Sequence, residues 1–83
     1  MENAVDKRIV VLLGSWVFIG EYHPAQDTVP AYLINASCIR SWGTTAGLGE
    51  IALSGPTETT KMDPCGTVIL EPNAVLFSLR CTR

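Results

Sequence analysis

The residues best suited to bind a small ligand are concentrated in one part of the 83-residue chain. Residues 41–67 hold five of the seven glycines and six of the eight threonines. Just before this segment Arg40 supplies a positive charge, and within it Trp42 supplies a flat face for stacking. The hydroxyls and backbone amides that follow are suited to hydrogen-bond an anion or a ribose. This pattern predicts a site for a phosphate-bearing small molecule, formed by Arg40, Trp42, Thr44, Thr45, Gly47, Gly49 and Glu50.

The same residues also have a purely structural interpretation. In that interpretation Thr45 or a neighbour caps a short helix, and the glycines serve only turn geometry. Arg40 forms an ion pair with Glu50, and Trp42 closes one end of the fold. The sequence leaves both interpretations open.

The segment Gly47–Ala52 matches the G-x-G-x-x-A pattern of dinucleotide-binding proteins. That pattern requires a long helix behind the glycines within a βαβ unit. Gly55–Pro56 ends the helix predicted here, over about residues 48–54, within two turns. We therefore do not expect a dinucleotide cofactor.

The residues that could support catalysis or bind a metal lack the necessary spacing. His23 is the one histidine, and Cys38, Cys65 and Cys81 form no C-x-x-C pair. Glu50 and Asp63 are more typical of caps and turns than of an acid–base pair. We expect no enzyme activity, no metal site and no cofactor.

The elements that position these residues are predicted to be strands. Runs of β-branched and aromatic residues with alternating polarity, separated by turn residues, predict five strands. Gly14–Ser15 predicts a two-residue type II′ turn in the first hairpin, and Asp63–Pro64 is typical of a turn. The expected fold is mainly β, a small five-stranded barrel or bent antiparallel sheet in one domain over residues 1–83. A long central loop, about 41–66, contains the one short helix. The predicted strands are 8–13, 16–21, 31–40, 67–71 and 75–81.

The first predicted hairpin is apolar on both faces. On one face lie Val10, Leu12, Trp16 and Phe18, and they alternate with Ile9, Val11, Leu13, Val17 and Ile19 on the other. A domain of this size has one core, so one face is expected to pack against a second copy of the chain. The alternative is that a loop of the same chain covers it.

Composition narrows the class of partner and the compartment. Six Lys and Arg against eight Asp and Glu give a net charge of −2, which disfavours nucleic-acid binding. The apolar run Ile9–Gly20 is too short to span a membrane and lacks the features of an export signal. Three widely spaced cysteines do not fit a secreted disulfide framework. We expect a cytoplasmic protein that binds neither membranes nor nucleic acid.

Two stretches carry a resemblance to a known family. They are Cys38–Ala52, with the pattern C-I-R-x-W-G-T-T-x-G-L-G-E-I-A, and Asp63–Val68, with the pattern D-P-C-G-T-V. Over roughly residues 8–82 the chain resembles a family of short uncharacterised proteins from phage, prophage and bacterial genomes. The resemblance implies a setting, the host cytoplasm if the protein is phage-encoded, and no mechanism.

Small oligomeric phage proteins include inhibitors of bacterial defence that sequester nucleotide signals, and this analogy suggests a function. The leading hypothesis is a non-enzymatic homo-oligomer that binds a nucleotide-like ligand in a counter-defence role. The alternative is a protein-interaction module, either an inhibitor of a host protein or a virion accessory protein. An enzyme ranks behind both.

Overall fold

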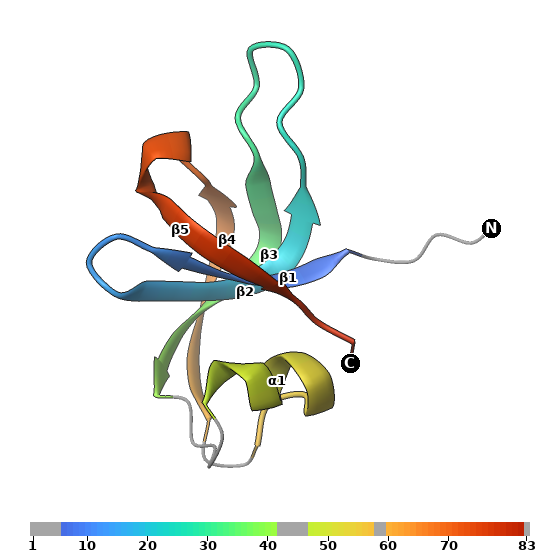
Figure 1. Ribbon diagram of the computed structural model, residues 1–83, viewed down its shortest axis with the longest axis vertical. Coiled ribbons are helices and arrows are strands. Elements are labelled where there is room, and N and C mark those ends of the chain that lie inside the picture. The colour runs from blue at the N-terminus through green and yellow to red at the C-terminus, as the bar shows by residue number, and fades with distance from the viewer. Residues whose placement is uncertain (1–5, 42–46, 58–59, 83) are drawn as a thin grey trace, which may run out of the picture.

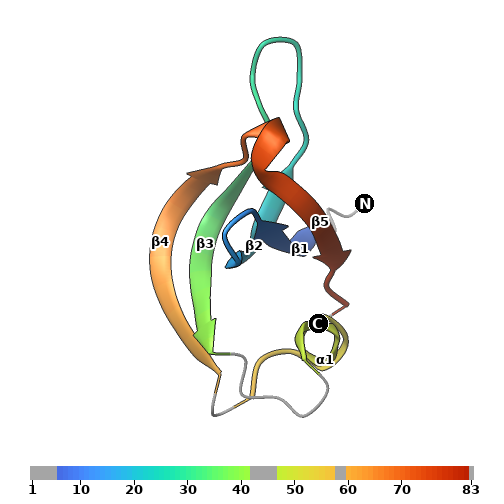
Figure 2. The ribbon, with the colours of Figure 1, turned by 60° about the vertical axis from the view of Figure 1, so that its left-hand side comes forward.

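The computed structural model describes residues 6–41, 47–57 and 60–82. In this part of the chain five strands form one antiparallel sheet, in the order β4-β3-β2-β1-β5, with one short helix (Figure 1). The predicted mainly β, strongly bent fold is confirmed, and the sheet curls without closing into a barrel (Figure 2). The elements are β1 (Lys7–Leu12), β2 (Trp16–His23), β3 (Tyr32–Ser41), α1 (Leu48–Ser54), β4 (Lys61–Ile69), the 3₁₀ turn η1 (Pro72–Ala74) and β5 (Val75–Arg80).

Irregularities in strand pairing accompany the curl of the sheet. The register between β2 and β3 shifts between Ile19 and Glu21, and the register between β3 and β4 shifts between Leu33 and Ala36. Asn35 lies inside the second shift with φ of 49°, a conformation that asparagine tolerates better than most residues. Such bulges bend the strand and increase its local twist. They account for the folding of β3 and β4 over one face of the hairpin.

Strand β4 begins six residues earlier than the sequence predicted. Asp63 pairs with Cys38 and Pro64 with Ser37, so Asp63–Pro64 is part of a strand and the prediction of a turn there is wrong. The predicted central loop over residues 41–66 is also too long, because its last six residues belong to β4. Strand β4 is at an edge of the sheet, and an edge strand tolerates a residue without an N–H.

The turn of the first hairpin differs in type from the prediction. Leu12 pairs with Trp16, so three residues form the connection, and both Gly14 and Ser15 have positive φ, at 83° and 66°. A type II′ turn has positive φ only at its first central residue, so that assignment is wrong, although the positive φ of Gly14 is confirmed. Leu13 leaves the hairpin ladder because its N–H donates to the carbonyl oxygen of Ala74 at 2.8 Å.

Replacing Gly14 should therefore destabilise the protein. A side chain at this φ is strained, and a Cβ there would lie 3.3 Å from Cδ1 of Trp16. We expect Gly14→Val to lower the free energy of unfolding by at least ~1 kcal/mol. The reverse change at the next residue, Ser15→Gly, should be neutral or stabilising. Urea denaturation of both variants measures this, and an unchanged midpoint for Gly14→Val would contradict it.

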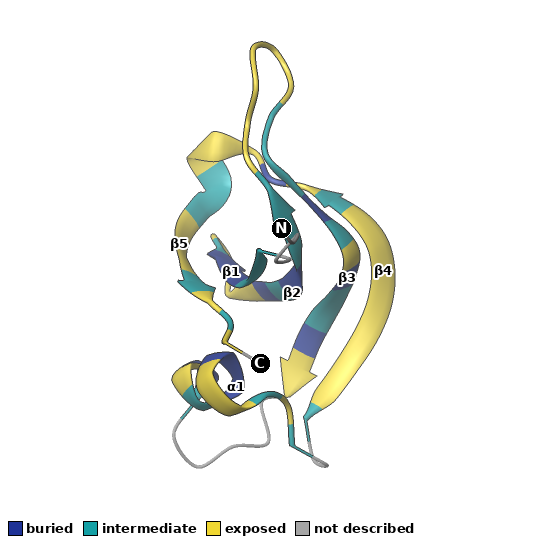
Figure 3. Ribbon diagram, turned by 90° about the vertical axis from the view of Figure 1, so that its right-hand side faces the viewer, coloured by how far each residue is buried: buried dark blue, intermediate teal, exposed yellow. Residues whose placement is uncertain are grey.

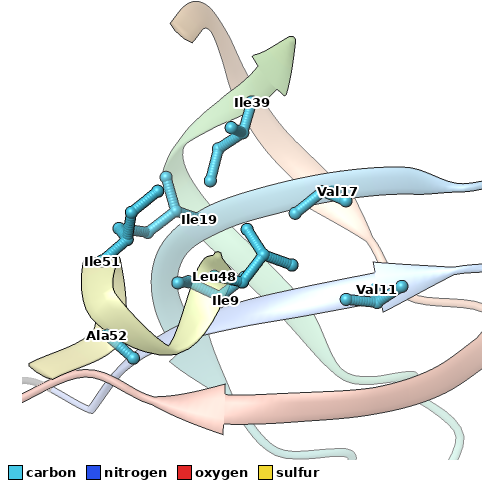
Figure 4. Close-up of a cluster of buried hydrophobic side chains, with 8 residues drawn as sticks. All are labelled: Ile9, Val11, Val17, Ile19, Ile39, Leu48, Ile51 and Ala52. Atoms are coloured by element: carbon cyan, nitrogen blue, oxygen red, sulfur yellow. The ribbon is translucent and has the colours of Figure 1, made fainter. Parts of the chain in front are cut away.

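The core has two parts, one on each face of the hairpin. On one face, α1 packs its buried side chains, Ile51 among them, against β1 and β2 (Figure 4). On the other face, Val10 packs with Leu33, Ala36 and Leu70 inside the curl of the sheet. Val10 is only 1% exposed, so the premise that the second face must be buried by another subunit is wrong. The predicted alternation of the two faces is confirmed.

The edges of the sheet are exposed, in contrast to its centre. Strand β4 is exposed along nearly its whole length, and β5 along most of its length (Figure 3). Buried residues are concentrated on β1, β2, β3 and α1.

Candidate functional site

Arg40, the predicted cationic residue, lies near the end of β3 and is well exposed. Its Nε forms an ion pair with Oδ2 of Asp63 on the neighbouring strand β4. The structural interpretation predicted an ion pair with Glu50 instead, and the partner found is Asp63. Because both side chains are more than half exposed, the pair contributes little to stability.

Of the other predicted site residues, those that the structure describes, Gly47, Gly49 and Glu50, do not join Arg40 on one face. Trp42, Thr44 and Thr45 lie outside the described residues. Gly47, with φ of 77°, is the N-cap of α1, and Gly49 and Glu50 belong to its first turn. Ile39 packs in the cluster that α1 covers, whereas the ion pair places Arg40 on the other face, beside Asp63, which pairs with Cys38. Among the described residues, Arg40 and the start of α1 therefore lie on opposite faces of the sheet.

Arg40 instead lines a hollow of about 260 Å³ between the turn of the first hairpin and the end of β3. Phe18 pairs with Cys38, so Trp16, two residues before Phe18, lies on the Cys38 face of the sheet. Arg40 shares this face, because its ion-pair partner Asp63 pairs with Cys38. Trp16 is 59% exposed although it is the largest side chain there. The hollow is lined by Gly14, Ser15, Trp16, Val17, Cys38, Ile39 and Arg40.

The sequence pattern did not single out Trp16 as a binding residue. The alternation of the hairpin places it on an apolar face, where a tryptophan is usually core. Its position directly after the Gly14–Ser15 turn could have indicated that Trp16 is exposed. A side chain at the tip of a hairpin extends beyond the strands that could cover it.

The chemistry of the hollow is that of binding. The Trp16 indole offers a stacking face and an N–H donor, and the Arg40 guanidinium offers donors for an anionic or carbonyl group. His23 stacks on Tyr32 with ring centroids 4.9 Å apart and lies elsewhere. It is five residues along β2 from Phe18, about 16 Å away at the rise of a strand. The structure therefore does not bring the histidine to the Cys38 thiol.

The cysteines are all free thiols. The thiol of Cys65 donates to the carbonyl oxygen of Ala36 on the adjacent strand, with Sγ and O 3.5 Å apart. Burial raises the pKa of Cys65, and the neighbouring Cys38 thiol adds to the shift. Burial likewise raises the pKa of Cys81. The Cys65 and Cys81 thiols are therefore predominantly protonated, and poor nucleophiles, at neutral pH.

Arg80, another exposed arginine, lies at the far end of the hairpin. Its Nε is 3.8 Å from Oδ1 of Asp6, and it pairs across the sheet with Arg8. Arg8 itself donates two hydrogen bonds to Asp6, each 3.0 Å long, and covers the ring of Tyr22. These residues form a separate cluster at the start of β1.

Comparisons with known proteins do not identify the chain. No family model, curated protein or solved structure matches it. The resemblance to short phage and bacterial proteins thus stays a prediction, and any function has to be argued from the site itself.

Two further features are absent from residues 6–41, 47–57 and 60–82. No group of three or more His, Cys, Asp or Glu side chains lies close enough together to hold a metal ion. No helix in these ranges is both long and apolar enough to cross a membrane.

Proposed function

We propose that this protein is a non-enzymatic binding protein whose site is the hollow beside the first hairpin turn. The ligand we propose is nucleotide-like, a flat ring that carries an anionic group. The observation that supports this is the position of Trp16 and Arg40 on one face of neighbouring strands, around a hollow of about 260 Å³.

The exposure of Trp16 supports a stacking role. A tryptophan more than half exposed leaves a large aromatic surface in water, and a ring stacked on it would remove that surface. Stacking of a base on an aromatic side chain contributes about 1–3 kcal/mol. The volume of the hollow lies near the lower end of the range for ligand pockets, about 300 Å³. It therefore suits a single base or nucleoside with its phosphate outside.

The ion pair of Arg40 supports an exchangeable phosphate contact. Breaking an exposed ion pair costs about 0–1 kcal/mol, and a hydrogen bond to a charged group returns about 1.5–3 kcal/mol. Arg40 can therefore leave Asp63 for a phosphate with a net gain. A ligand with a flat ring and no anionic group would lack this contribution to the binding free energy.

The biological setting we propose follows from the resemblance and from analogy. It is a protein of phage or bacterial origin that sequesters a nucleotide signal in the cytoplasm, the host cytoplasm if it is phage-encoded, as a counter-defence. Self-association belongs to the same proposal, because the analogy is with small phage proteins that are oligomeric.

Calorimetric titration with mono-, di- and cyclic nucleotides tests the function. We expect at least one nucleotide to bind the wild type. Trp16→Ala should then weaken binding by ~1–3 kcal/mol and Arg40→Ala by ~1.5–3 kcal/mol. Both side chains are exposed, so the midpoint of thermal unfolding should change little.

Arg80→Ala is the matched control, because it removes an exposed arginine at the far end of the hairpin. We expect it to leave nucleotide affinity unchanged. Heat from no nucleotide, or an equal loss of affinity in Arg80→Ala and Arg40→Ala, would contradict the proposed site.

One observation favours the second candidate, a protein-interaction module. Leu13, Leu76 and Phe77 are 55%, 57% and 50% exposed, and the N–H of Leu13 bonds to Ala74, beside the start of β5. Large apolar side chains left exposed on neighbouring segments favour a contact with another protein.

A further inference from the structure

We propose that the curled sheet holds a second binding site, a pocket of about 240 Å³ that takes a small uncharged aromatic molecule. The pocket lies on the inside of the curl, beside Val10 and Leu70 of the second part of the core. It shares no described lining residue with the hollow at Trp16, so this site does not depend on the proposed nucleotide site.

The two edge strands of the sheet meet beside this pocket. Leu70 directly follows β4, Val75 begins β5, and the turn η1 connects the two strands at this end of the curl (Figure 2). The N–H of Leu70 donates to the carbonyl oxygen of Ala31 at 2.8 Å, which holds the end of β4 against the segment before β3. Packed strands and a turn therefore form the walls of the pocket.

The lining is buried at its base and exposed at its rim. Val10 is 1% and Leu70 is 3% exposed, whereas Pro72 and Ser78 are exposed. Ser78 pairs with Val10 across β1 and β5, so its side chain lies on the inside of the curl and places a hydroxyl at the rim. A ligand would bury its apolar part against Val10 and keep a polar atom near Ser78.

The chemistry of the lining favours an uncharged ligand. The described lining residues are aliphatic or proline apart from Tyr22 and Ser78, and none of them carries a charge. Arg8 lies over the Tyr22 ring, but its guanidinium already donates two hydrogen bonds to Asp6. A charged ligand group would therefore lose its hydration without gaining a partner. Tyr22 also favours an aromatic ligand, because aromatic rings contact one another favourably.

The volume of the pocket limits the size of the ligand. An apolar cavity of about 150 Å³ is large enough to bind benzene. A pocket of about 240 Å³ therefore accommodates a somewhat larger ring system, roughly nine non-hydrogen atoms, which is the size of indole. It is too small to enclose a whole nucleotide or a peptide segment.

Titration with indole, followed by the backbone amide signals in NMR spectra, tests the site. We expect indole to bind the wild type with a dissociation constant below about 1 mM, a modest affinity for a ligand of this size. The amides of Val10, Leu70, Val75 and Ser78 should shift most strongly. Indole-3-carboxylate, which adds a negative charge to the same ring, should bind at least about tenfold more weakly.

Two substitutions block the pocket at different places. Ala31→Leu puts a larger apolar side chain into its wall, and Ser78→Leu replaces the hydroxyl at its rim. Each should weaken indole binding at least about tenfold without lowering the unfolding midpoint, because the pocket has room for the new side chain. Ala74→Leu is the matched control, because Ala74 lies in η1 outside the described lining. It should bind indole as the wild type does.

A wild type that does not bind indole would overturn the proposal. So would undiminished binding in either blocking variant, a loss of binding in Ala74→Leu, or equally tight binding of indole-3-carboxylate. Trp16→Ala separates this site from the proposed nucleotide site, since it should leave indole affinity unchanged. A large loss of indole affinity in Trp16→Ala would place the ring in the other hollow and overturn the second site. The nucleotide titration bears on the proposed function alone.

Discussion

Ile51→Ala should lower the free energy of unfolding by about 3 kcal/mol, within the range of about 2–5 kcal/mol for removing a buried isoleucine. The side chain of Ile51 is fully buried and packs between the backbone of α1 and the hairpin of β1 and β2 (Figure 4). A helix of seven residues is not stable alone in water, so packing has to hold α1 in place. Truncating the Ile51 side chain removes packing that the helix cannot replace.

Leu53→Ala on the same helix is the control. Leu53 is 66% exposed, so this change should alter the free energy of unfolding by less than about 0.5 kcal/mol. Urea denaturation monitored by circular dichroism compares the two variants. Similar losses for both would mean that α1 is not held by the Ile51 face.

Gly20→Ala should cost about 2 kcal/mol, which is typical of overpacking a core. A Cβ on Gly20 would lie 3.1 Å from Cα and Cβ of Ala36 and from the carbonyl oxygen of Ile34. These are mainly backbone atoms of β3, which cannot rotate out of the way as a flexible side chain does. The strands would have to separate at the bend on which the curl of the sheet depends.

Gly49→Ala should have the opposite effect on stability. A Cβ there meets nothing within 4 Å, and alanine is favoured over glycine inside a helix by up to ~1 kcal/mol. We expect Gly49→Ala to raise the unfolding midpoint and Gly20→Ala to lower it. A neutral Gly20→Ala would show that β2 and β3 do not approach so closely.

Local patterns were sufficient to predict most elements of the fold. The helix over residues 48–54 and the first hairpin follow from apolar spacing and from glycine at the turn and the helix end. The start of β4 could not be predicted, because Asp63–Pro64 has turn chemistry and only the edge position of the strand makes it acceptable. The burial of both hairpin faces also escaped prediction, because it depends on bulges such as the one at Asn35.

The candidate site was predicted only in part. Arg40 was identified from its type and position, but its partner Asp63 is 23 residues away, and its position follows from a register that no local pattern encodes. Trp16 reaches the same hollow from another strand. Of the rest of the predicted set, Gly47, Gly49 and Glu50 lie at the start of α1, and Trp42, Thr44 and Thr45 lie outside the described residues.

An NMR titration of isotopically labelled protein with the nucleotide of highest affinity tests the central claim most directly. Binding in the hollow should shift the Trp16 indole N–H and the backbone amides of 14–17 and 38–40 most strongly, while the amides of α1 move little. The largest shifts at Gly47–Ile51, or no shifts with any nucleotide, would contradict a binding site formed by Trp16 and Arg40.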